Sequence, residues 1–282
     1  MRGLWLLMLV LLAGCQHAVA PAPVSGEIRD LQSGEVLTSQ QLMTRLARPE
    51  RLIIGEQHDN ADHHTAQLWL LRALGEQRQQ GSLLLEMLTP DQQPKVVAAR
   101  QTPASADVAK ALDWQDGWDW TLYGPIVRFA LSQPYPLLAA NLDNNEIRAV
   151  YRESPALSGA RSNAASVQNT LLEQISDSHC GLLPESQMPA MLAVQQQRDR
   201  RMAERLLAAP TPSILLAGAW HARKDAGVPL HVLDLGAADA PTVLMLAEQG
   251  EKVTAVMADY VWYTPATSKP DYCEQMRKQF GK

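Results

Sequence analysis

Residues 51–55 read Arg51-Leu-Ile-Ile-Gly55, a short unbroken apolar run that predicts a buried β-strand. A helical pattern follows from about Ala61 to Gln79, and the same alternation continues along the chain. Further strands are predicted at residues 82–86, 136–141, 213–218, 231–235 and 252–256, and further helices at about 164–175 and 186–207. Apolar strands separated by helices predict an α/β fold: a mainly parallel β-sheet flanked by helices on both faces.

The segment before this pattern predicts a small N-terminal β-hairpin. Two strand-like stretches flank Ser33-Gly34 between Glu27 and Thr38. A chain of 282 residues is long enough for one large domain or two small ones. Because the sequence contains no internal repeat or linker after the hairpin, we expect residues 25–282 to form a single α/β domain.

The composition is that of a globular protein. Hydrophobic residues make up 46% and charged residues 20% of the chain, which excludes disorder, collagen and polar low-complexity arrays. The formal net charge is −5. Nucleic-acid binding through a general basic surface is therefore not expected.

The N-terminus has the pattern of a secretory signal. A cationic start at Arg2 precedes an apolar run from Leu4 to Leu12, which is too short to span a membrane as a helix. The ending Leu12-Ala-Gly-Cys15 resembles the bacterial lipobox, in which the cysteine is lipidated and becomes the first mature residue. We expect residues 1–14 to be the signal peptide and residues 15–24 a lipidated tether. A signal peptide cleaved elsewhere, with an incidental cysteine, is the alternative.

The residue after the cysteine bears on localisation. Gln16 stands where lipoproteins retained at the inner membrane typically carry aspartate, so anchoring at the outer membrane is favoured. The remaining thiols are Cys180 and Cys273. In an oxidising periplasm they could form a disulfide that ties the C-terminus to the body, or stay as two buried thiols.

Polar residues end four of the predicted strands. Ligands of parallel sheets gather beyond the carboxyl ends of the strands, so these residues are expected to share one site, although every strand must also end somewhere. Gly-x-x-His occurs at residues 55–58 and again at 218–221. The candidate residues are Glu56, His58, Glu86, Asn141 and His221.

These strand ends also allow an enzyme. Paired histidines with Glu56 and Glu86 resemble the metal-dependent Tiki/TraB peptidase and erythromycin esterase families, which are hydrolases. The sequence contains no Gly-x-Ser-x-Gly nucleophile motif, but a metal-activated water remains available. The alternative function is therefore a metal-dependent hydrolase that uses Glu56, His58, Glu86 and His221.

A second cluster combines aromatic and acidic side chains. It lies between Asp113 and Arg128 and is either an exposed platform for a flat ligand or partner, or an ordinary aromatic corner. Its aromatic members are Trp114, Trp118, Trp120 and Tyr123, and its acidic members are Asp113, Asp116 and Asp119.

Several motifs occur in an order and spacing that point to a known family. They are Gly55-Glu-Gln-His-Asp-Asn60 with His63-His64, Leu85-Glu86-Met87, Trp120-x-x-Tyr123, Ala140-Asn141, His179-Cys180-Gly181, Gln197-x-Asp199-x-x-Met202-Ala203, and His221 with Asp225 and Gly227-Val228-Pro229. With this set the chain resembles the ChaN-type haem-binding lipoprotein family.

The resemblance implies a periplasm-facing lipoprotein that binds ferric haem for haem and iron uptake, with two haems stacked in a homodimer. It implies tyrosine ligation of the iron, and phenolate is an anionic oxygen ligand that suits ferric iron. Tyr123 is the predicted axial ligand, beside Trp118 and Trp120. The other possible ligands are Tyr135, Tyr151, Tyr260, Tyr263 and Tyr272, and the candidates for the propionates are His63, His64 and Arg128, with Arg223 and Lys224 as further possibilities.

A binding and transport protein is favoured over an enzyme. Its expected partners are haem, a second copy of the chain, outer-membrane lipid through acylated Cys15, and other components of haem uptake.

Overall fold

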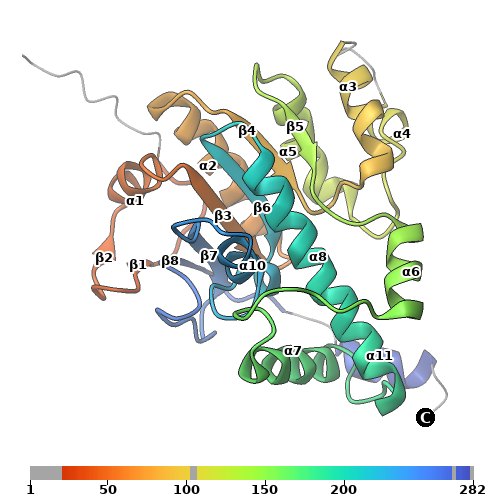
Figure 1. Cartoon of the computed structure of the whole chain (residues 1–282). Coiled ribbons are helices and arrows are strands. Elements are labelled where there is room, and N and C mark those ends of the chain that lie inside the picture. The colour runs from red at the N-terminus through yellow and green to blue at the C-terminus, as the bar shows by residue number, and fades with distance from the viewer. Residues whose placement is uncertain (1–20, 102–106, 269–270, 280–282) are drawn as a thin grey trace, which may run out of the picture.

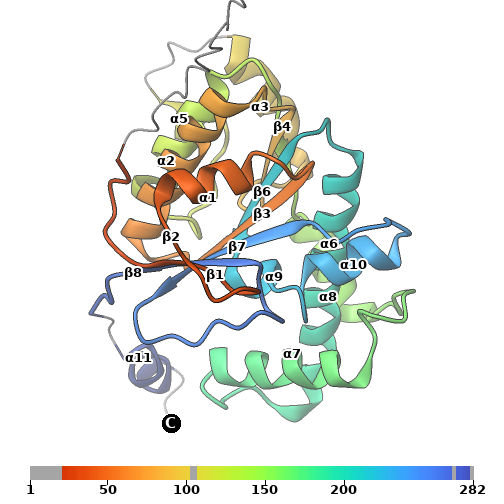
Figure 2. The same ribbon diagram turned by 90° about the vertical axis from the view of Figure 1, so that its left-hand side faces the viewer.

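The computed structural model describes residues 21–101, 107–268 and 271–279. The predicted signal peptide, Cys15 and the first part of the tether lie outside these residues. The described chain forms one eight-stranded sheet with helices on both of its faces (Figures 1 and 2). None of its described helices is long and apolar enough to cross a membrane.

Six neighbouring strands of the sheet are parallel, and an antiparallel hairpin extends one edge. The strand order is β2-β1-β8-β7-β3-β6-β4-β5, with β1 antiparallel to both β2 and β8. The predicted mainly parallel sheet with an N-terminal hairpin is therefore confirmed. The strands are β1 (Ile28–Asp30), β2 (Val36–Leu37), β3 (Arg51–Glu56), β4 (Ser82–Leu85), β5 (Leu137–Ala139), β6 (Ser213–Gly218), β7 (Thr242–Glu248) and β8 (Tyr260–Thr264).

Helices connect the strands and cover the sheet. They are α1 (Ser39–Leu46), α2 (Ala61–Gln77), α3 (Gln93–Gln101), α4 (Val108–Ala111), α5 (Trp120–Leu131), α6 (Asn144–Glu153), α7 (Ala165–Ser178), α8 (Met188–Ala208), α9 (Ala219–Ala222), α10 (Val228–Asp234) and α11 (Tyr272–Gln279). Short 3₁₀ turns occupy residues 90–92 and 185–187.

Polar side chains cap the N-termini of helices α2 and α6. Asn60 caps α2, because its side chain accepts a hydrogen bond from the backbone N–H of His63 at 3.1 Å. Asp143 and Glu146 form a reciprocal capping box at the start of α6. The cap at Asn60 ends the β3–α2 loop, so it also sets the path of the residues that follow β3.

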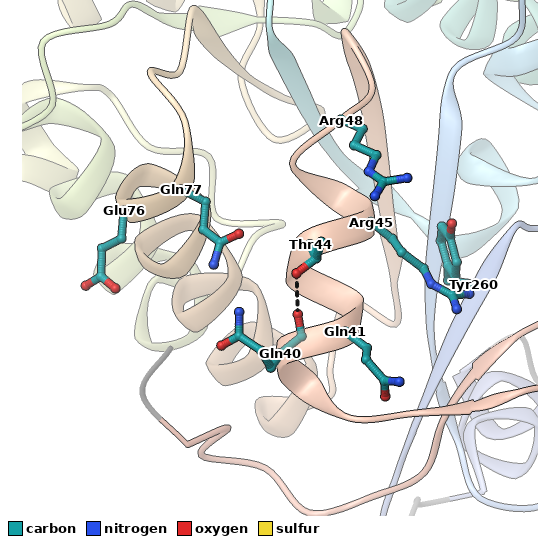
Figure 3. A pocket seen from close by; sticks show the side chains of 8 residues that line it. All are labelled: Gln40, Gln41, Thr44, Arg45, Arg48, Glu76, Gln77 and Tyr260. Atoms are coloured by element: carbon teal, nitrogen blue, oxygen red, sulfur yellow. Dashed lines mark hydrogen bonds between the residues drawn. The ribbon is translucent and has the colours of Figure 1, made fainter. Parts of the chain in front are cut away.

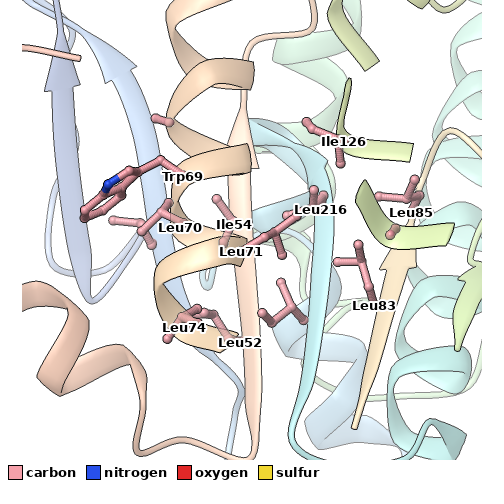
Figure 4. Close-up of a cluster of buried hydrophobic side chains, with 14 of the residues drawn as sticks. Leu52, Ile54, Trp69, Leu70, Leu71, Leu74, Leu83, Leu85, Ile126 and Leu216 are labelled. Carbon is pink, nitrogen blue, oxygen red and sulfur yellow. The ribbon is translucent and has the colours of Figure 1, made fainter. Parts of the chain in front are cut away.

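Each central strand buries both of its faces. In β3, Leu52 and Ile54 point into the core under α1, α2 and α5, where Figure 4 shows them against Leu70 and Leu74. Ile53 points to the opposite face and packs with residues of α8 and α10. This two-sided burial explains why the strands read as continuous apolar runs without alternation.

Two of the strand predictions are wrong. Residues 231–234 belong to helix α10, and Leu235 is its C-cap. The buried Val228 and Val232 of this helix are four residues apart and face α8. Residues 252–256 are loop and turn. The last two strands of the chain are instead β7 and β8. The predictions failed because short apolar runs do not by themselves distinguish a strand from a buried helix segment or a turn.

A disulfide links the C-terminal helix to the body of the domain. Cys180 follows the end of α7, and Cys273 lies in the first turn of α11; their Cα atoms are 5.5 Å apart. The bridge spans 93 residues of sequence. It holds α11 beside α7, as Figure 1 shows.

Cys273→Ser should lower the free energy of unfolding by about 2–4 kcal/mol, because the cross-link restricts the unfolded chain. Urea denaturation under non-reducing conditions measures the change. The double variant Cys180→Ser/Cys273→Ser is the control and should match the single variant, since both lack the same link. Identical curves for oxidised wild type and Cys273→Ser would contradict the expectation.

Candidate functional site

The carboxyl ends of the central strands bring the polar strand-end residues together. Glu56, the last residue of β3, is paired in register with Gly218, the last residue of β6. Glu86 follows β4, which lies on the other side of β6. The sequence expectation that these strand ends share one region therefore matches the positions of Glu56, His58, Glu86 and His221.

The first group in this region consists of Glu56, His58 and Tyr123. His58 Nδ1 lies 2.7 Å from Glu56 Oε1 and 3.0 Å from the Tyr123 hydroxyl. Tyr123 donates its own hydrogen bond to Glu56 Oε1 at 2.9 Å. Glu56 and Tyr123 are buried, whereas the His58 side chain is 43% exposed.

This environment holds the phenol neutral and favours charge on the imidazole. Burial and the charge of Glu56 raise the pKa of Tyr123 well above its ordinary value. Burial would lower the pKa of His58, but its bond to Glu56 and the charge of Glu86 outweigh burial and raise that pKa.

The second group is a buried carboxylate–imidazole–carboxylate chain. His221, in the short helix α9, has Nδ1 2.7 Å from Asp199 Oδ1 and Nε2 3.4 Å from Glu86 Oε1. The other oxygen of Glu86 accepts a hydrogen bond from the backbone N–H of Gly218 at 2.7 Å. All three side chains are buried.

The pKa shifts within the second group favour an ion pair between His221 and Glu86. Burial opposes the charge on His221, yet Glu86 and Asp199 raise its pKa to about 10. Burial also opposes the charge on Glu86, but the imidazolium lowers the pKa of Glu86 well below its ordinary value. Burial raises the pKa of Asp199 to about 6 even though His221 acts against it. His221 is therefore a fixed cation at neutral pH.

A cavity of about 420 Å³ opens beside both groups. Glu56, His58 and His221 line it at the strand ends. Trp220 of α9 and Arg223, the C-cap of α9, also line it. The Arg223 guanidinium stacks 4.4 Å from the centre of the Trp220 ring, which is 36% exposed. The wall thus carries two imidazoles and one accessible aromatic face.

Comparison with known proteins identifies the family of this chain. Residues 42–232 match the model of the family described as haem-binding uptake, Tiki superfamily, ChaN. The chain belongs to this family.

Three solved structures are similar to this chain to different degrees. The structure of cofacial haem binding to ChaN of Campylobacter jejuni is 28% identical, with a TM-score of 0.79 over 86% of this chain and 97% of that chain. An erythromycin esterase mutant, EreC in its open conformation, is 15% identical, with a TM-score of 0.47 over 89% and 86% of the two chains. RRSP, a MARTX toxin effector domain from Vibrio vulnificus, is 16% identical, with a TM-score of 0.45 over 84% and 39%. No curated protein matches the sequence significantly.

In this ChaN-family chain the predicted iron ligand does not face solvent. Tyr123 is 1% exposed, and its hydroxyl is engaged by Glu56 and His58. Tyr123 therefore holds Glu56 and His58 in place and does not fit the role of an open axial ligand.

The aromatic cluster around Tyr123 is a packed corner. The ring of Trp118 contacts His58 edge-on at 4.9 Å, and Trp114 contacts Trp120 in the same manner at 5.0 Å. All three tryptophans are partly buried against the main core. The expected open platform of Trp118 and Trp120 is thus only partly accessible, and Arg128 lies exposed over the Trp120 ring.

The two histidines of α2 face inward. His63 is fully buried: its Nδ1 accepts the backbone N–H of Gln57 at 3.0 Å, and its Nε2 lies 3.1 Å from Thr264 Oγ1. His64 is 4% exposed, with Nε2 3.0 Å from the His58 carbonyl oxygen. Neither is placed to bind haem propionates, because both shape the loop that carries His58.

The alternative function, a metal-dependent hydrolase, would require side chains that converge on a metal ion. Within residues 21–101, 107–268 and 271–279, no group of three or more histidine, cysteine and acidic side chains is arranged to hold a metal ion. Each of these four side chains, Glu56, His58, Glu86 and His221, instead has at least one donor atom in a hydrogen bond or ion pair with another protein group.

Three contributors were not assigned to the site from sequence. Asp199 belonged to a family motif, but its pairing with His221 depends on how α8 crosses β6. Gln195, four residues earlier on the same face of α8, also lines the cavity. Trp220 precedes His221 directly, and only the turn into α9 exposes its ring.

A second hollow, of about 900 Å³, lies near the amino end of β8 (Figure 3). It is lined mainly by amides and charged side chains of α1 and α2, with Tyr260 on one side. Arg45 in its wall forms ion pairs with Asp30 and Glu35. The paired histidines and the exposed tryptophan belong to the other cavity, so we place the candidate site there.

His221→Gln should lower the free energy of unfolding by about 3–5 kcal/mol near pH 6.5, because it leaves two buried carboxylates without their cation. The pKa of His221 is raised on folding, so its contribution is complete below pH 6.5 and is lost as pH rises toward about 10. Urea unfolding at several pH values should show the free energies of unfolding of wild type and His221→Gln becoming equal over that range.

The control is His179→Gln, since the His179 ring is half-buried and bonds the carbonyl oxygen of Ile175 at the end of α7. The difference in free energy of unfolding between wild type and His179→Gln should not become smaller between pH 6.5 and 10. A constant difference for His221→Gln across the same range would show that His221 is not a buried cation.

Proposed function

We propose that this protein binds ferric haem and serves haem and iron uptake as an outer-membrane-anchored lipoprotein. The observation that carries the proposal is membership of the haem-binding ChaN family across residues 42–232. The 28% identity to the Campylobacter jejuni ChaN structure, which covers 97% of that chain, supports it.

The mouth of the strand-end cavity has the chemistry that a porphyrin needs. Haem is a flat apolar ring with two carboxylate arms, and Trp220 offers a partly exposed aromatic face. Val253 and Met257 add apolar lining from the loop between β7 and β8. Arg223 and Lys252 line the same cavity and supply positive charge for the propionates.

We propose Tyr272 as the phenol that ligates the iron, because its hydroxyl lies against the loop that carries His58. Its ring is 48% exposed, and its hydroxyl donates to Asp59 Oδ2 at 2.8 Å, one residue from His58. The bond to Asp59 raises the pKa of Tyr272, and the same carboxylate can accept the phenol proton when the oxygen binds iron. Tyrosine is an established haem ligand, and phenolate suits ferric iron.

Tyr272→Phe should abolish the high-spin charge-transfer band of the ferric-haem complex and weaken binding by at least about tenfold, since it removes an iron–oxygen bond. Haem titration of protein that begins after Cys15, followed by visible absorption, measures both quantities. Tyr123→Phe is the matched control and should keep the band, because its hydroxyl bonds Glu56.

Loss of the band in Tyr123→Phe with retention in Tyr272→Phe would reverse the assignment of the ligand. Absence of any saturable haem binding by the wild-type protein would overturn the proposed function. The same titration counts haems per chain, and sedimentation with and without haem tests the proposed homodimer with stacked haems.

The membrane anchor is proposed at Cys15, which lies outside the described residues. Cys15→Ala should move the protein from the outer-membrane fraction to the soluble periplasm, because each acyl chain contributes about 0.8 kcal/mol per buried CH₂. Membrane fractionation and immunoblotting decide this. Continued sedimentation of the variant with outer membranes would exclude Cys15 as the anchor.

A further inference from the structure

We propose that a separate hollow beside Asn141 binds the carboxylate group of a small, singly charged organic anion. The hollow encloses about 500 Å³ and lies between the end of β5, the start of α3 and the C-terminal turns of α8. From sequence, Asn141 was expected to share a site with the other polar strand ends. It lines this hollow instead, and not the cavity that contains His58 and His221.

The hollow and the histidine cavity are distinct sites along one helix. Gln195 of α8 lines the histidine cavity, whereas Arg205 of the same helix lines the hollow. Their Cα atoms are separated by about 15 Å along the axis, because each residue of an α-helix rises about 1.5 Å. Figure 1 shows the C-terminal end of α8 near β5 and its other end near α7. A ligand in the hollow therefore does not occupy the proposed haem site.

Asn141 supplies two N–H donors to the hollow. The residue is 4% exposed, and its Oδ1 accepts the backbone N–H of Leu142 at 2.8 Å. Its own backbone N–H donates to the Leu88 carbonyl oxygen at 3.1 Å, so the residue is fixed at the strand end. Within the described part of the chain, no acceptor bonds its Nδ2. Both hydrogens of this amide are thus available to a ligand oxygen, which a buried donor requires.

Arg205 supplies the positive charge. Its Nε donates to the carbonyl oxygen of Ala139 at 3.1 Å, which fixes the guanidinium at the end of β5. Among residues 21–101, 107–268 and 271–279, no carboxylate forms an ion pair with Arg205. Its terminal nitrogens therefore keep their N–H donors for a ligand. Guanidinium binds carboxylate through two parallel hydrogen bonds, in a geometry that a single ammonium cannot offer.

The neighbouring charges limit the charge of the ligand. Arg201 also lines the hollow, but Glu146 neutralises it through an ion pair at 2.6 Å. Glu204 lines the hollow from an exposed position and adds one negative charge. One unpaired guanidinium beside one exposed carboxylate favours a singly charged anion over a phosphate dianion, which would meet stronger repulsion.

The rest of the wall is small and apolar, and its members are Pro90, Ala139 and Ala208. The Gln93 amide is already used, because its Nε2 donates to the Leu137 carbonyl oxygen at 3.0 Å and its Oε1 accepts the Ala139 N–H at 2.7 Å. A carboxylate on a short aliphatic chain therefore matches the lining. Free short-chain acids and the C-terminal carboxylate of a peptide share this chemistry.

The direct test is an NMR titration of haem-free wild-type protein with sodium butyrate at constant ionic strength. The side-chain amide signals of Asn141 and the Nε–H signal of Arg205 should shift to saturation together. Butyramide has the same size without the charge, so it should bind at least about tenfold more weakly. Equal affinities for the two compounds, or saturable shifts confined to the Trp220 indole, overturn the proposal.

Variants test the two donors separately. Asn141→Asp keeps the size of the side chain and an acceptor for the Leu142 N–H, but adds negative charge to the wall. Arg205→Gln removes the guanidinium. Each should weaken butyrate binding by at least about tenfold. The matched control is Arg148→Gln, which removes the same charge from an exposed side chain of α6 that bonds Asn145 outside the hollow.

Arg148→Gln should bind butyrate as the wild type does. Equal affinities of Arg205→Gln and Arg148→Gln would show that only overall charge matters, and this result would overturn the proposal. The comparison of butyrate with butyramide uses the wild-type protein alone, so it stays decisive if a variant fails to fold.

A peptide probe separates the two sources of the carboxylate. Tighter binding of N-acetyl-alanyl-alanine than of butyrate would identify peptide C-termini as the ligand, and the reverse order would identify free short-chain acids. Either order supports a carboxylate site. The C-terminal amide of the same peptide should bind at least about tenfold more weakly than its acid. Equal binding of the amide and the acid would show recognition of the peptide backbone and would overturn the proposal.

Discussion

The structure depends on two carboxylates buried at the ends of its central strands. A buried charge without a partner is costly, so Glu56 and Glu86 each require partners at fixed positions. Glu56 takes hydrogen bonds involving Tyr123 and His58, and Glu86 takes the backbone N–H of Gly218 and the charge of His221. These partners come from α5, the β3–α2 loop and the turn into α9, so one constraint orders three connections around the sheet.

The same constraint also shapes the strand-end cavity. The imidazoles that satisfy the carboxylates line the cavity, while Trp220 and Arg223 stand at its edge, where a porphyrin would lie. Haem binding calls for an accessible apolar face with positive charge, which is the chemistry of Trp220 and Arg223. Both sets of groups can belong to one site because α9 carries His221 on its buried side and Trp220 on its exposed side.

The sequence was most informative where burial on both faces leaves a continuous apolar run. Strands β3, β4 and β6 were predicted close to their observed positions, as was the helix after Asn60. It was least informative at residues 231–235 and 252–256, where short apolar segments form a helix and a turn instead of strands. At residues 231–235 the packing of α10 on α8 decides the structure. So short a segment shows no clear hydrophobic periodicity from which this packing could be predicted.

By itself, the sequence determined the alternation of strands and helices, the hairpin, and the placement of Glu56, Glu86 and His221 at strand ends, because these follow from local periodicity and from the common direction of parallel strands. Only the tertiary structure decided that Tyr123 turns inward to Glu56 and that Asp199 meets His221. It also decided that Tyr272 reaches Asp59 from helix α11, which the neighbouring Cys273 links to Cys180. These pairings join residues far apart in the chain, and they depend on helix positions that no local pattern encodes.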